Sequence, residues 1–390
     1  MKKRILFCLQ TMVMGGVEKE LITVLNKLDR AQFDIELLLF YTQDTDIMKS
    51  VPGDIKITVL RLDKAYWLCN GAQYVKSRMK KGKFAEAMQI ACKTAKYGGA
   101  SSAYVNLGDI AMLPGEYDSA ICYHMHSGMV LRYVAEKVNA KRKVAWIHND
   151  FNTTGYKIEC YDSALSKYDF FVAVSERLRR EFVQHCPNYA SCAITIHNAI
   201  DEEEIRERAM EKPDYSFECD HRIKLVTVGR YVEQKGFDLA IETCRILRNR
   251  GLDIAWYAIG WGPDESMLHK MVKQNGLENC FYIMGRKNNP YPYINGADIY
   301  VQPSRHEGYG ITIAEAKVLR KIIVCTNFAG ADEQIVDGLN GVVVKTFEPE
   351  HIADAIFRIC SDECERKKIN DGIEKFVQES TLKAISNILL

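Results

Sequence analysis

The stretch from residue 299 to residue 324 constrains the fold of this chain more than any other. A short apolar run, Ile299–Val301, is followed by a proline and then by a polar loop with two glycines. From Ile311 onward apolar residues recur at helical spacing, and a β-branched run begins at Ile322. Strand, loop, helix and strand in this order form a βαβ unit, and such units build parallel sheets. We therefore predict an α/β protein whose ligands bind at the carboxyl ends of its strands.

Two carboxylates flank the end of the loop and the start of the helix. Glu307 lies in the loop, at the expected mouth of a crevice, and Glu315 lies about one turn into the helix. Because helical side chains lean towards the N-terminus, both should face one pocket. A phosphate fits between them, since glycines allow close approach and a helix N-terminus attracts anions. The backbone amides expected to hold it belong to Gly308, Tyr309, Gly310, Ile311 and Thr312.

Taken alone, the carboxylate pair has a second interpretation, in which Glu315 complements the helix dipole and Glu307 is solvated. The surrounding segments favour a ligand site. The order ADIYVQPS, EGYG, AEA and GLNG, with Glu307 and Glu315 in E-x7-E spacing, resembles glycosyltransferase family 4. The resemblance implies the GT-B fold, two Rossmann-like domains whose parallel sheets face a central cleft, and a retaining enzyme that uses nucleotide sugars. It also implies that Glu307 holds donor-sugar hydroxyls and Glu315 the ribose.

Further donor-binding residues follow from the same resemblance. The block GRYVEQKG looks like the family's second donor signature, in which Arg230 and Lys235 meet the diphosphate. Physical chemistry agrees, because a guanidinium and an ammonium at a strand end can neutralise a leaving pyrophosphate. Near the start of the chain, a Gly-Gly turn that lacks the GxGxxG fingerprint places Gly16 where the family approaches the donor phosphates. Arg286 follows a predicted strand near the base site, and Trp261 replaces an acidic residue of the family.

Histidines end two predicted strands of the N-terminal half. AWIHND resembles the family segment that supplies a histidine beside the transferred sugar, which makes His148 a candidate catalytic residue. His126, in the less specific piece HMHS, is a second candidate, for acceptor binding. A single histidine is more often structural, but histidines grouped at strand ends favour a functional interpretation.

The length of 390 residues suits two domains. We predict an N-terminal acceptor-binding Rossmann-like domain over residues 1–200, completed by a C-terminal helix at 373–390. A charged linker at 201–221 leads to a nucleotide-sugar-binding Rossmann-like domain at 222–372. A net charge of +1 gives no basic balance for nucleic acid. The 13 cysteines include no CxxC pair, which favours a reducing cytosol over a disulfide scaffold or zinc site.

Two charged segments have bland and functional interpretations. The basic run Lys76–Lys83 is expected to be a solvated helix face, with a contact to anionic membrane lipid as the alternative. The triplet Asp44-Thr45-Asp46 is expected to be a solvated loop and not a metal site. No cofactor and no divalent metal are expected, because arginine, lysine and helix amides can offset the charge of the leaving group.

The predicted protein is a retaining glycosyltransferase that moves a hexose-type sugar from a nucleotide sugar, UDP by default. The acceptor is expected to be a hydroxyl of a glycan or lipid-linked glycan in cell-envelope or capsular polysaccharide synthesis. We expect a cytoplasmic protein, with a peripheral position on the inner face of the cell membrane as an added hypothesis. The alternatives are a GT-B nucleotide-sugar epimerase and a non-catalytic sugar-nucleotide-binding partner.

Overall fold

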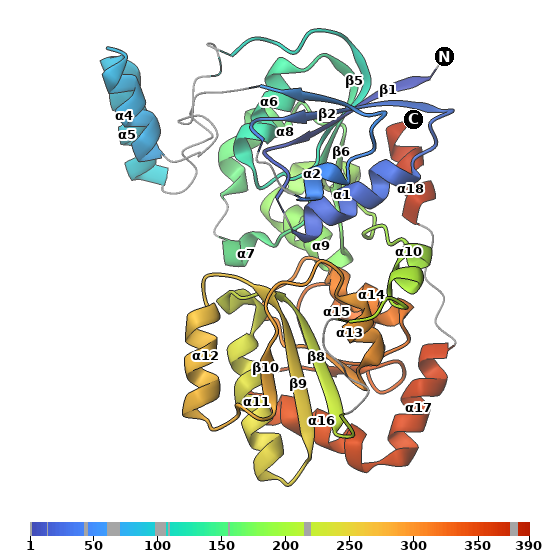
Figure 1. Ribbon diagram of the computed structural model, residues 1–390. Helices are drawn as coiled ribbons and strands as arrows, with labels where there is room; N and C mark the ends of the chain where they lie inside the picture. The colour runs from blue at the N-terminus through green and yellow to red at the C-terminus, as the bar shows by residue number, and fades with distance from the viewer. Residues whose placement is uncertain are drawn as a thin grey trace. The chain divides into compact units, whose positions relative to one another are not determined.

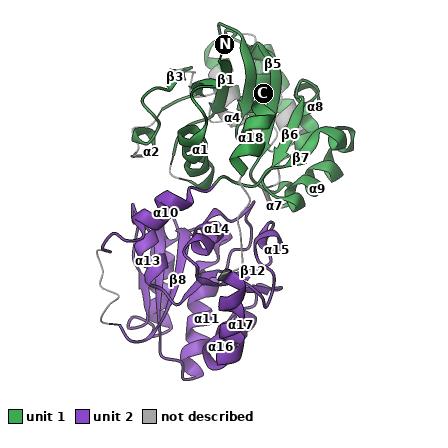
Figure 2. Ribbon diagram, turned by 90° about the vertical axis from the view of Figure 1, so that its right-hand side faces the viewer, with its two compact units in different colours: residues 1–199, 380–390 green, residues 200–379 purple. Residues whose placement is uncertain are grey.

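The computed structural model describes residues 2–13, 15–42, 46–60, 71–97, 107, 110–154, 157–213, 220–374 and 381–390. The chain divides into two compact units, drawn in different colours in Figure 2. Unit 1 comprises residues 1–199 and 380–390, and unit 2 comprises residues 200–379. Each unit is described by itself below.

Unit 1 is built on a parallel sheet that has seven strands within the described residues, in the order β3-β2-β1-β4-β5-β6-β7. The central strands form because their apolar runs are buried on both faces, as parallel sheets require. Cys8 of β1, for example, pairs with Leu38 of β2 on one side and with Cys122 of β4 on the other. The strands are β1 (Lys3–Leu9), β2 (Phe33–Leu39), β3 (Lys56–Val59), β4 (Tyr117–Cys122), β5 (Ala140–Ile147), β6 (Phe170–Ala173) and β7 (Ala193–Thr195).

Helices connect these strands, as Figure 1 shows. They are α1 (Gly16–Lys27), α2 (Asp46–Lys49), α4 (Gly71–Lys80), α5 (Phe84–Tyr97), α6 (Gly128–Lys137), α7 (Phe151–Thr154), η2 (Ile158–Tyr161), α8 (Asp162–Leu165), α9 (Glu176–His185) and η3 (Pro187–Cys192). The C-terminal helix α18 (Thr381–Leu389) also packs on unit 1. The Ser119 hydroxyl donates to the Leu389 carbonyl at 2.9 Å, and the Arg142 guanidinium donates to the Ile388 carbonyl at 2.9 Å.

Unit 2 is built on a second parallel sheet, with the order β10-β9-β8-β11-β12-β13 in the described chain. Successive side chains alternate between two hydrophobic cores, one on each face of the sheet. Leu225 and Trp256 belong to one core, whereas their neighbours Val226 and Tyr257 belong to the other. The strands are β8 (Ile223–Arg230), β9 (Ile254–Trp261), β10 (Phe281–Ile283), β11 (Ile299–Gln302), β12 (Ile322–Thr326) and β13 (Val342–Val344).

Two helical layers cover the two faces of this sheet. One layer contains η4 (Glu233–Lys235), α11 (Phe237–Asn249), α12 (Glu265–Gln274), α16 (Pro349–Ser361) and α17 (Glu363–Glu374). The other contains α10 (Glu202–Arg208), α13 (Tyr291–Gly296), α14 (Ile311–Val318) and α15 (Ala331–Gln334). The predicted βαβ unit is β11, α14 and β12, and its two strands pair in parallel, from Ile299 with Ile322 to Gln302 with Cys325.

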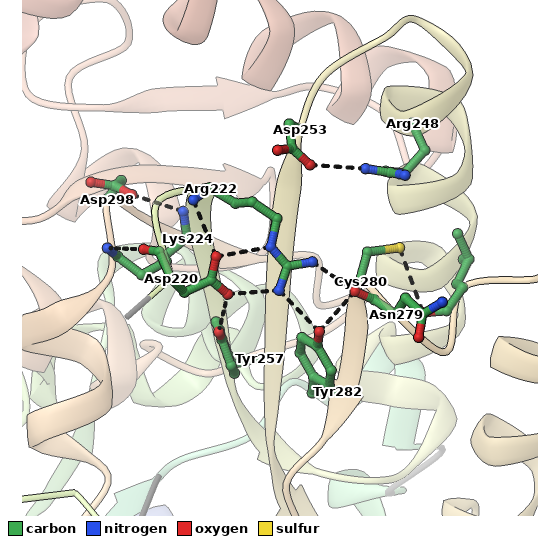
Figure 3. Close-up of polar contacts among 11 residues, drawn as sticks. Asp220, Arg222, Lys224, Arg248, Asp253, Tyr257, Asn279, Cys280, Tyr282 and Asp298 are labelled. Carbon is green, nitrogen blue, oxygen red and sulfur yellow. Dashed lines mark hydrogen bonds and ion pairs between the residues drawn. The ribbon is translucent and has the colours of Figure 1, made fainter. Parts of the chain in front are cut away.

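A polar network holds the amino edge of this sheet (Figure 3). The Arg222 guanidinium donates to both carboxylate oxygens of Asp220, at 2.8 and 2.7 Å, and to the hydroxyl of Tyr282 at 2.9 Å. The Tyr257 hydroxyl donates to the same carboxylate at 2.9 Å. The hydrogen bonds from the Arg222 side chain, with that from Tyr257, therefore lower the pKa of Asp220. The network joins β8, β9 and β10 at the edge opposite the expected ligand site.

The structure corrects several expectations. The segment expected as a linker at 201–221 begins with helix α10, which packs on α13 and α14 of unit 2. The return to unit 1 follows α17, so Ile373 belongs to unit 2 and not to the returning helix. Arg78, expected on a solvated face, is buried, and its guanidinium lies 3.6 Å from the Glu86 carboxylate. The Asp44-Thr45-Asp46 triplet lies outside the described residues, except for the backbone of Asp46.

Among the described helices, none combines the length and the apolar character that crossing a membrane requires.

Candidate active site

The candidate site of unit 2 is centred on the Glu307 carboxylate, in the loop after β11. Its Oε1 accepts hydrogen bonds from Lys235 Nζ at 2.5 Å, Ser304 Oγ at 2.9 Å and Gln302 Nε2 at 3.0 Å. Lys235 comes from the loop after β8, so the ion pair joins two loops that follow adjacent strands. Glu307 lies in the loop at the carboxyl edge of the sheet, where the sequence predicted it.

The loop between Glu307 and α14 is held tightly from the α15 side. Gly310 has a φ of +85°, and a Cβ at this position would lie 2.9 Å from the Phe328 ring. Gln334 Nε2 donates to the carbonyls of Tyr309 and Gly310, at 2.5 and 3.3 Å. Helix α14 begins at Ile311 after a glycine that offers no capping side chain. The first amides of the helix therefore point out of its end, where an anion can accept from them.

Glu315 lies inside α14 and is only 2% exposed. The Tyr291 hydroxyl of α13 donates to its Oε1 at 3.2 Å. Burial raises the pKa of Tyr300, and the nearby charges of Glu315 and Glu307 raise it further. Both carboxylates therefore act on one tyrosine of β11, and the expectation that both face one pocket stays a prediction.

Arg230 and Trp261 end two adjacent strands, and the register of β8 and β9 pairs them directly. The Arg230 guanidinium lies 6.0 Å from the centre of the Trp261 ring, which is 41% exposed. The backbones of β8 and β9 approach closely here. A Cβ on Gly260 would therefore lie 1.8 Å from the Gly229 carbonyl oxygen. The two side chains thus form a cationic and aromatic surface at the ligand edge.

Arg286 is exposed and lies three residues after Ile283, the last residue of β10. Strand β10 is separated from β8 by β9, so Arg286 reaches the same edge two strands away from Arg230.

Three histidines of unit 1, His124, His126 and His148, lie at the carboxyl ends of β4 and β5. His148 is 5% exposed, its ring centre lies 5.2 Å from that of Tyr123, and the His124 ring centre lies 6.1 Å away. Burial lowers the pKa of His148 well below its usual value, and the repulsion that its protonated form would meet from protonated His124 or His126 adds to this. Burial also lowers the pKa of His126 to about 3 and that of His124 to about 4. All three rings are therefore neutral at pH 7.

Other polar atoms at this edge are buried without a hydrogen-bond partner within the described residues. They are Thr11 Oγ1, Glu20 Oε2, Tyr123 OH, His148 Nε2 and Asn198 Oδ1. Gly16 is the first residue of α1, which also carries Glu20 on its buried face. Burial raises the pKa of Glu20 to about 8, and the Ala199 amide donates to its Oε1 at 3.4 Å.

Sequence reasoning missed Glu20 and Gln302. Glu20 stands four residues before the buried Val24, so its position on the apolar face of α1 was detectable from helical spacing. Gln302 ends an apolar run just before Pro303, where its length and polarity set it apart. Within the described residues, no three His, Cys, Asp or Glu side chains form a group that could hold a metal ion. The independence from divalent metal stays a prediction.

The match to a protein-family model falls within unit 2. Residues 212–376 match the family model described as glycosyl transferases group 1. An uncharacterized glycosyltransferase of Methanocaldococcus jannaschii is 26% identical over 273 residues, which is 65% of this chain and 68% of that protein. Alpha-D-kanosaminyltransferase of Streptomyces kanamyceticus is 32% identical over 161 residues, 41% of this chain and 40% of that protein. This second match thus spans less than half of its relative.

Solved structures are similar over nearly the whole chain. The crystal structure of Anabaena Alr3699/HepE in complex with UDP and glucose has a TM-score of 0.72 at 16% identity, and covers 99% of both chains. S. aureus TarM has a TM-score of 0.69 at 13% identity, again over 99% of both chains. At such identities the likeness concerns the fold, which in these proteins is GT-B. The match to the glycosyl transferases group 1 model thus lies within unit 2, and the fold of the chain is GT-B.

Proposed function

We propose that the protein is a retaining glycosyltransferase that moves a hexose-type sugar from a UDP-sugar to a hydroxyl of a glycan or lipid-linked glycan. The observation that carries the proposal is the setting of Glu307. Its Oε1 accepts three hydrogen bonds, from Lys235, Ser304 and Gln302, which fix the orientation of the carboxylate, and its second oxygen is the atom proposed to accept from a ligand. A carboxylate held in this way beside a helix N-terminus suits a sugar whose anomeric oxygen carries a diphosphate.

The charges around Glu307 suit the leaving group. When the anomeric C–O bond breaks, negative charge develops on the diphosphate. Arg230, Lys235 and the amides from Gly308 to Thr312 are the donors proposed to stabilise it, and Gly16 is proposed as a further residue that contacts the donor. Glu315 would accept from the ribose and Arg286 would contact the base.

Retention of configuration follows if the acceptor attacks from the face that the diphosphate leaves. The new bond joins the acceptor oxygen to the anomeric carbon, and the departing phosphate oxygen takes the acceptor's proton. No dedicated base is then required. His148, neutral at its buried position, would contact the transferred sugar as a hydrogen-bonding group, and His126 would contact the acceptor.

The names of similar proteins support the donor and the pathway class. HepE was solved in complex with UDP-glucose, and relatives include a capsular polysaccharide glycosyltransferase of Staphylococcus aureus, 26% identical over 39% of this chain. A lipopolysaccharide core glycosyltransferase of Rhizobium meliloti is 29% identical over 43% of this chain. These relatives are named for the biosynthesis of capsular polysaccharide and of the lipopolysaccharide core, which supports the class of acceptor that we propose here.

Contact with a membrane surface is part of the proposal and is supported by the α4–α5 hairpin. Its two helices expose the apolar side chains of Met79, Phe84 and Met88. The exposed lysines of the same hairpin are Lys76, Lys80, Lys81 and Lys83. Apolar side chains among cations are typical of segments that bind the anionic inner face of a membrane.

The test measures nucleotide release from a panel of nucleotide sugars, with and without a glycolipid fraction from the cell envelope. We expect UDP release that requires acceptor, and a product whose anomeric configuration by NMR equals that of the donor. An inverted product would contradict retention. Isomerised donor without acceptor would identify an epimerase instead. Binding is measured separately, since a donor at a hundred times its Kd should stabilise the fold by about 2.7 kcal/mol.

A further inference from the structure

Gln302 is a polar residue at the end of a strand whose other residues are apolar or aromatic and buried. It ends β11 after the buried residues Ile299, Tyr300 and Val301, and it is itself 1% exposed. A buried amide is costly unless its donors and acceptors find partners. Those partners define what this residue does.

The amide of Gln302 has four hydrogen bonds, which use its full capacity. Its Nε2 donates to Ser304 Oγ at 2.7 Å and to Glu307 Oε1 at 3.0 Å. Its Oε1 accepts from the Tyr300 hydroxyl at 2.5 Å and from Thr312 Oγ1 at 3.0 Å. Ser304 in turn donates to the same oxygen of Glu307, so Gln302 acts on Glu307 directly and through Ser304.

The orientation of this amide is fixed by chemistry. Turning it over would place its carbonyl oxygen against the Glu307 carboxylate, where two acceptors repel. The hydroxyl of Ser304 is also fully oriented, because it accepts from Gln302 and donates to Glu307. Further support comes from Thr326, whose hydroxyl donates to the Ser304 carbonyl at 2.5 Å. The network is therefore rigid before any ligand arrives.

We propose that Gln302 is a positioning residue that holds Oε1 of Glu307 in place and ties it to Thr312 at the start of α14. This rests on the proposed function, in which Glu307 binds the donor sugar and the end of α14 binds its diphosphate. Gln302 joins these two halves of the donor and sets the orientation of the sugar relative to its leaving group. A displacement of this carboxylate would lower turnover more than it lowers nucleotide affinity.

Gln302→Glu is the most informative variant, because it keeps the shape and the two accepted bonds but removes the amide donor. Its new oxygen would replace Nε2, which lies 3.0 Å from Glu307 Oε1. Two carboxyl groups so close together share a proton, and the pKa of the pair is raised. The protonated pair restores a donor to Glu307, whereas the deprotonated pair repels.

The expected result is a pH signature. At about pH 8, turnover of Gln302→Glu should fall about tenfold or more below wild type, and it should recover towards about pH 6. Affinity for free UDP, measured by calorimetry, should stay within about twofold of wild type, since no nucleotide contact changes. Gln302→Met, which lacks all four bonds, should lose turnover at both pH values without recovery.

Gln234→Glu is the matched control, because it adds the same charge to an exposed side chain that donates to the His306 carbonyl in the neighbouring loop. Its turnover should show no recovery of this kind. Equal turnover of wild type and Gln302→Glu at both pH values overturns the inference. So does a loss of UDP affinity that equals the loss of turnover, because Gln302 would then support the fold in general.

A stability measurement separates this inference from the proposed function. The folded pKa of the new pair is raised, so Gln302→Glu should match wild type in Tm at acid pH and lose Tm as the pH rises through that pKa. If wild type transfers no sugar but this Tm signature appears, the function is wrong and the contact between residues 302 and 307 stands. A Tm difference that is independent of pH overturns the contact and the inference with it.

Discussion

The carboxyl edges of the two sheets carry polar side chains in opposite states. In unit 2, the amide of Gln302 and the Oε1 atom of Glu307 are satisfied by hydrogen bonds from neighbouring residues. In unit 1, His148, Tyr123 and Glu20 each keep a buried polar atom without a partner in the described part of the chain. Buried polar atoms are normally hydrogen-bonded, so such atoms mark places where a ligand or water completes the structure. Gln334 Oε1 is a comparable atom in unit 2.

The two edges also differ in charge. Arg230, Lys235, Glu307 and Glu315 give unit 2 a charged edge, whereas burial keeps His124, His126 and His148 of unit 1 neutral at pH 7. Burial also raises the pKa of Glu20 to about 8, so this carboxyl holds a proton at pH 7. A charged edge whose side chains are already fixed suits an anionic donor whose charged group does not vary. A neutral edge with unused hydrogen-bonding atoms suits a hydroxyl-rich acceptor.

The strongest way to break this contrast is to remove the central carboxylate of unit 2. Glu307→Ala should lower turnover by a factor on the order of 100 to 1,000, because a preorganised contact to the reacting sugar is lost. Affinity for free UDP should remain nearly intact. Steady-state kinetics and calorimetry measure the two quantities. Glu278→Ala, on the exposed surface of unit 2, is the control, and an equal loss of UDP affinity in Glu307→Ala would contradict the assignment to the sugar.

Glu315 sharpens the comparison within unit 2. Glu315→Ala should weaken the binding of free UDP by about 1.5–3 kcal/mol, because a charged acceptor for the ribose is lost. Calorimetry with UDP measures the change. Tyr291→Phe removes only the hydroxyl that donates to Glu315 at 3.2 Å, and it should weaken UDP binding less. Unchanged affinity in Glu315→Ala would show that the ribose binds elsewhere.

Acid should affect unit 1 through its neutral histidines. A folded-state pKa of about 3 for His126, below the unfolded value of about 6.5, means that stability is lost as the pH falls below 6.5. His126→Phe keeps the stacking on Phe151, whose ring centre lies 4.7 Å away, but cannot take up a proton. The slope of unfolding free energy against pH should therefore decrease by about 1.4 kcal/mol per pH unit. Urea unfolding between about pH 4 and 6.5 measures it.

The control for this change is His269→Phe on the exposed face of α12. An equal decrease of slope in that variant would contradict the role of burial at His126.

Variants of the α4–α5 hairpin show whether unit 1, and not unit 2, binds a membrane surface. Charge reversal at Lys80 and Lys81 should weaken co-sedimentation with vesicles rich in anionic lipid, by about 1 kcal/mol for each lysine at the surface. High salt should weaken wild type in the same direction. Lys270→Glu with Lys273→Glu makes the same change on α12 of unit 2. Equal sedimentation of wild type and the Lys80/Lys81 variant would return the hairpin to a solvated surface.

The smallest expected effect is that of chelation. Transfer measured in excess EDTA should equal transfer with added magnesium or manganese, because Arg230, Lys235 and the start of α14 are proposed to offset the leaving charge. Loss of transfer in EDTA, with recovery on adding metal, would mean that a bound cation supplies part of that charge.

Periodicity was sufficient for the strands and for the βαβ unit around Glu307, because buried runs of apolar residues determine them. Strand ends were less predictable. The strand that was expected to end at the histidines of HMHS ends at Cys122 instead, and the residues that carry these histidines already belong to the loop. The Lys235–Glu307 ion pair was not expected, because it joins loops 72 residues apart. Arg78 was expected to be exposed to solvent. Its burial could not be predicted, because its partner Glu86 lies on the next helix.

The contacts of α18 have a consequence for how the chain is made. Ser119 and Arg142 of the first sheet find their carbonyl partners at Leu389 and Ile388, which the ribosome adds only after all of unit 2. Unit 2 is continuous in sequence and can fold while synthesis continues. Unit 1 is therefore translated first but completed after unit 2. The buried hydroxyl of Ser119 has its acceptor, the Leu389 carbonyl, only once α18 has been synthesised.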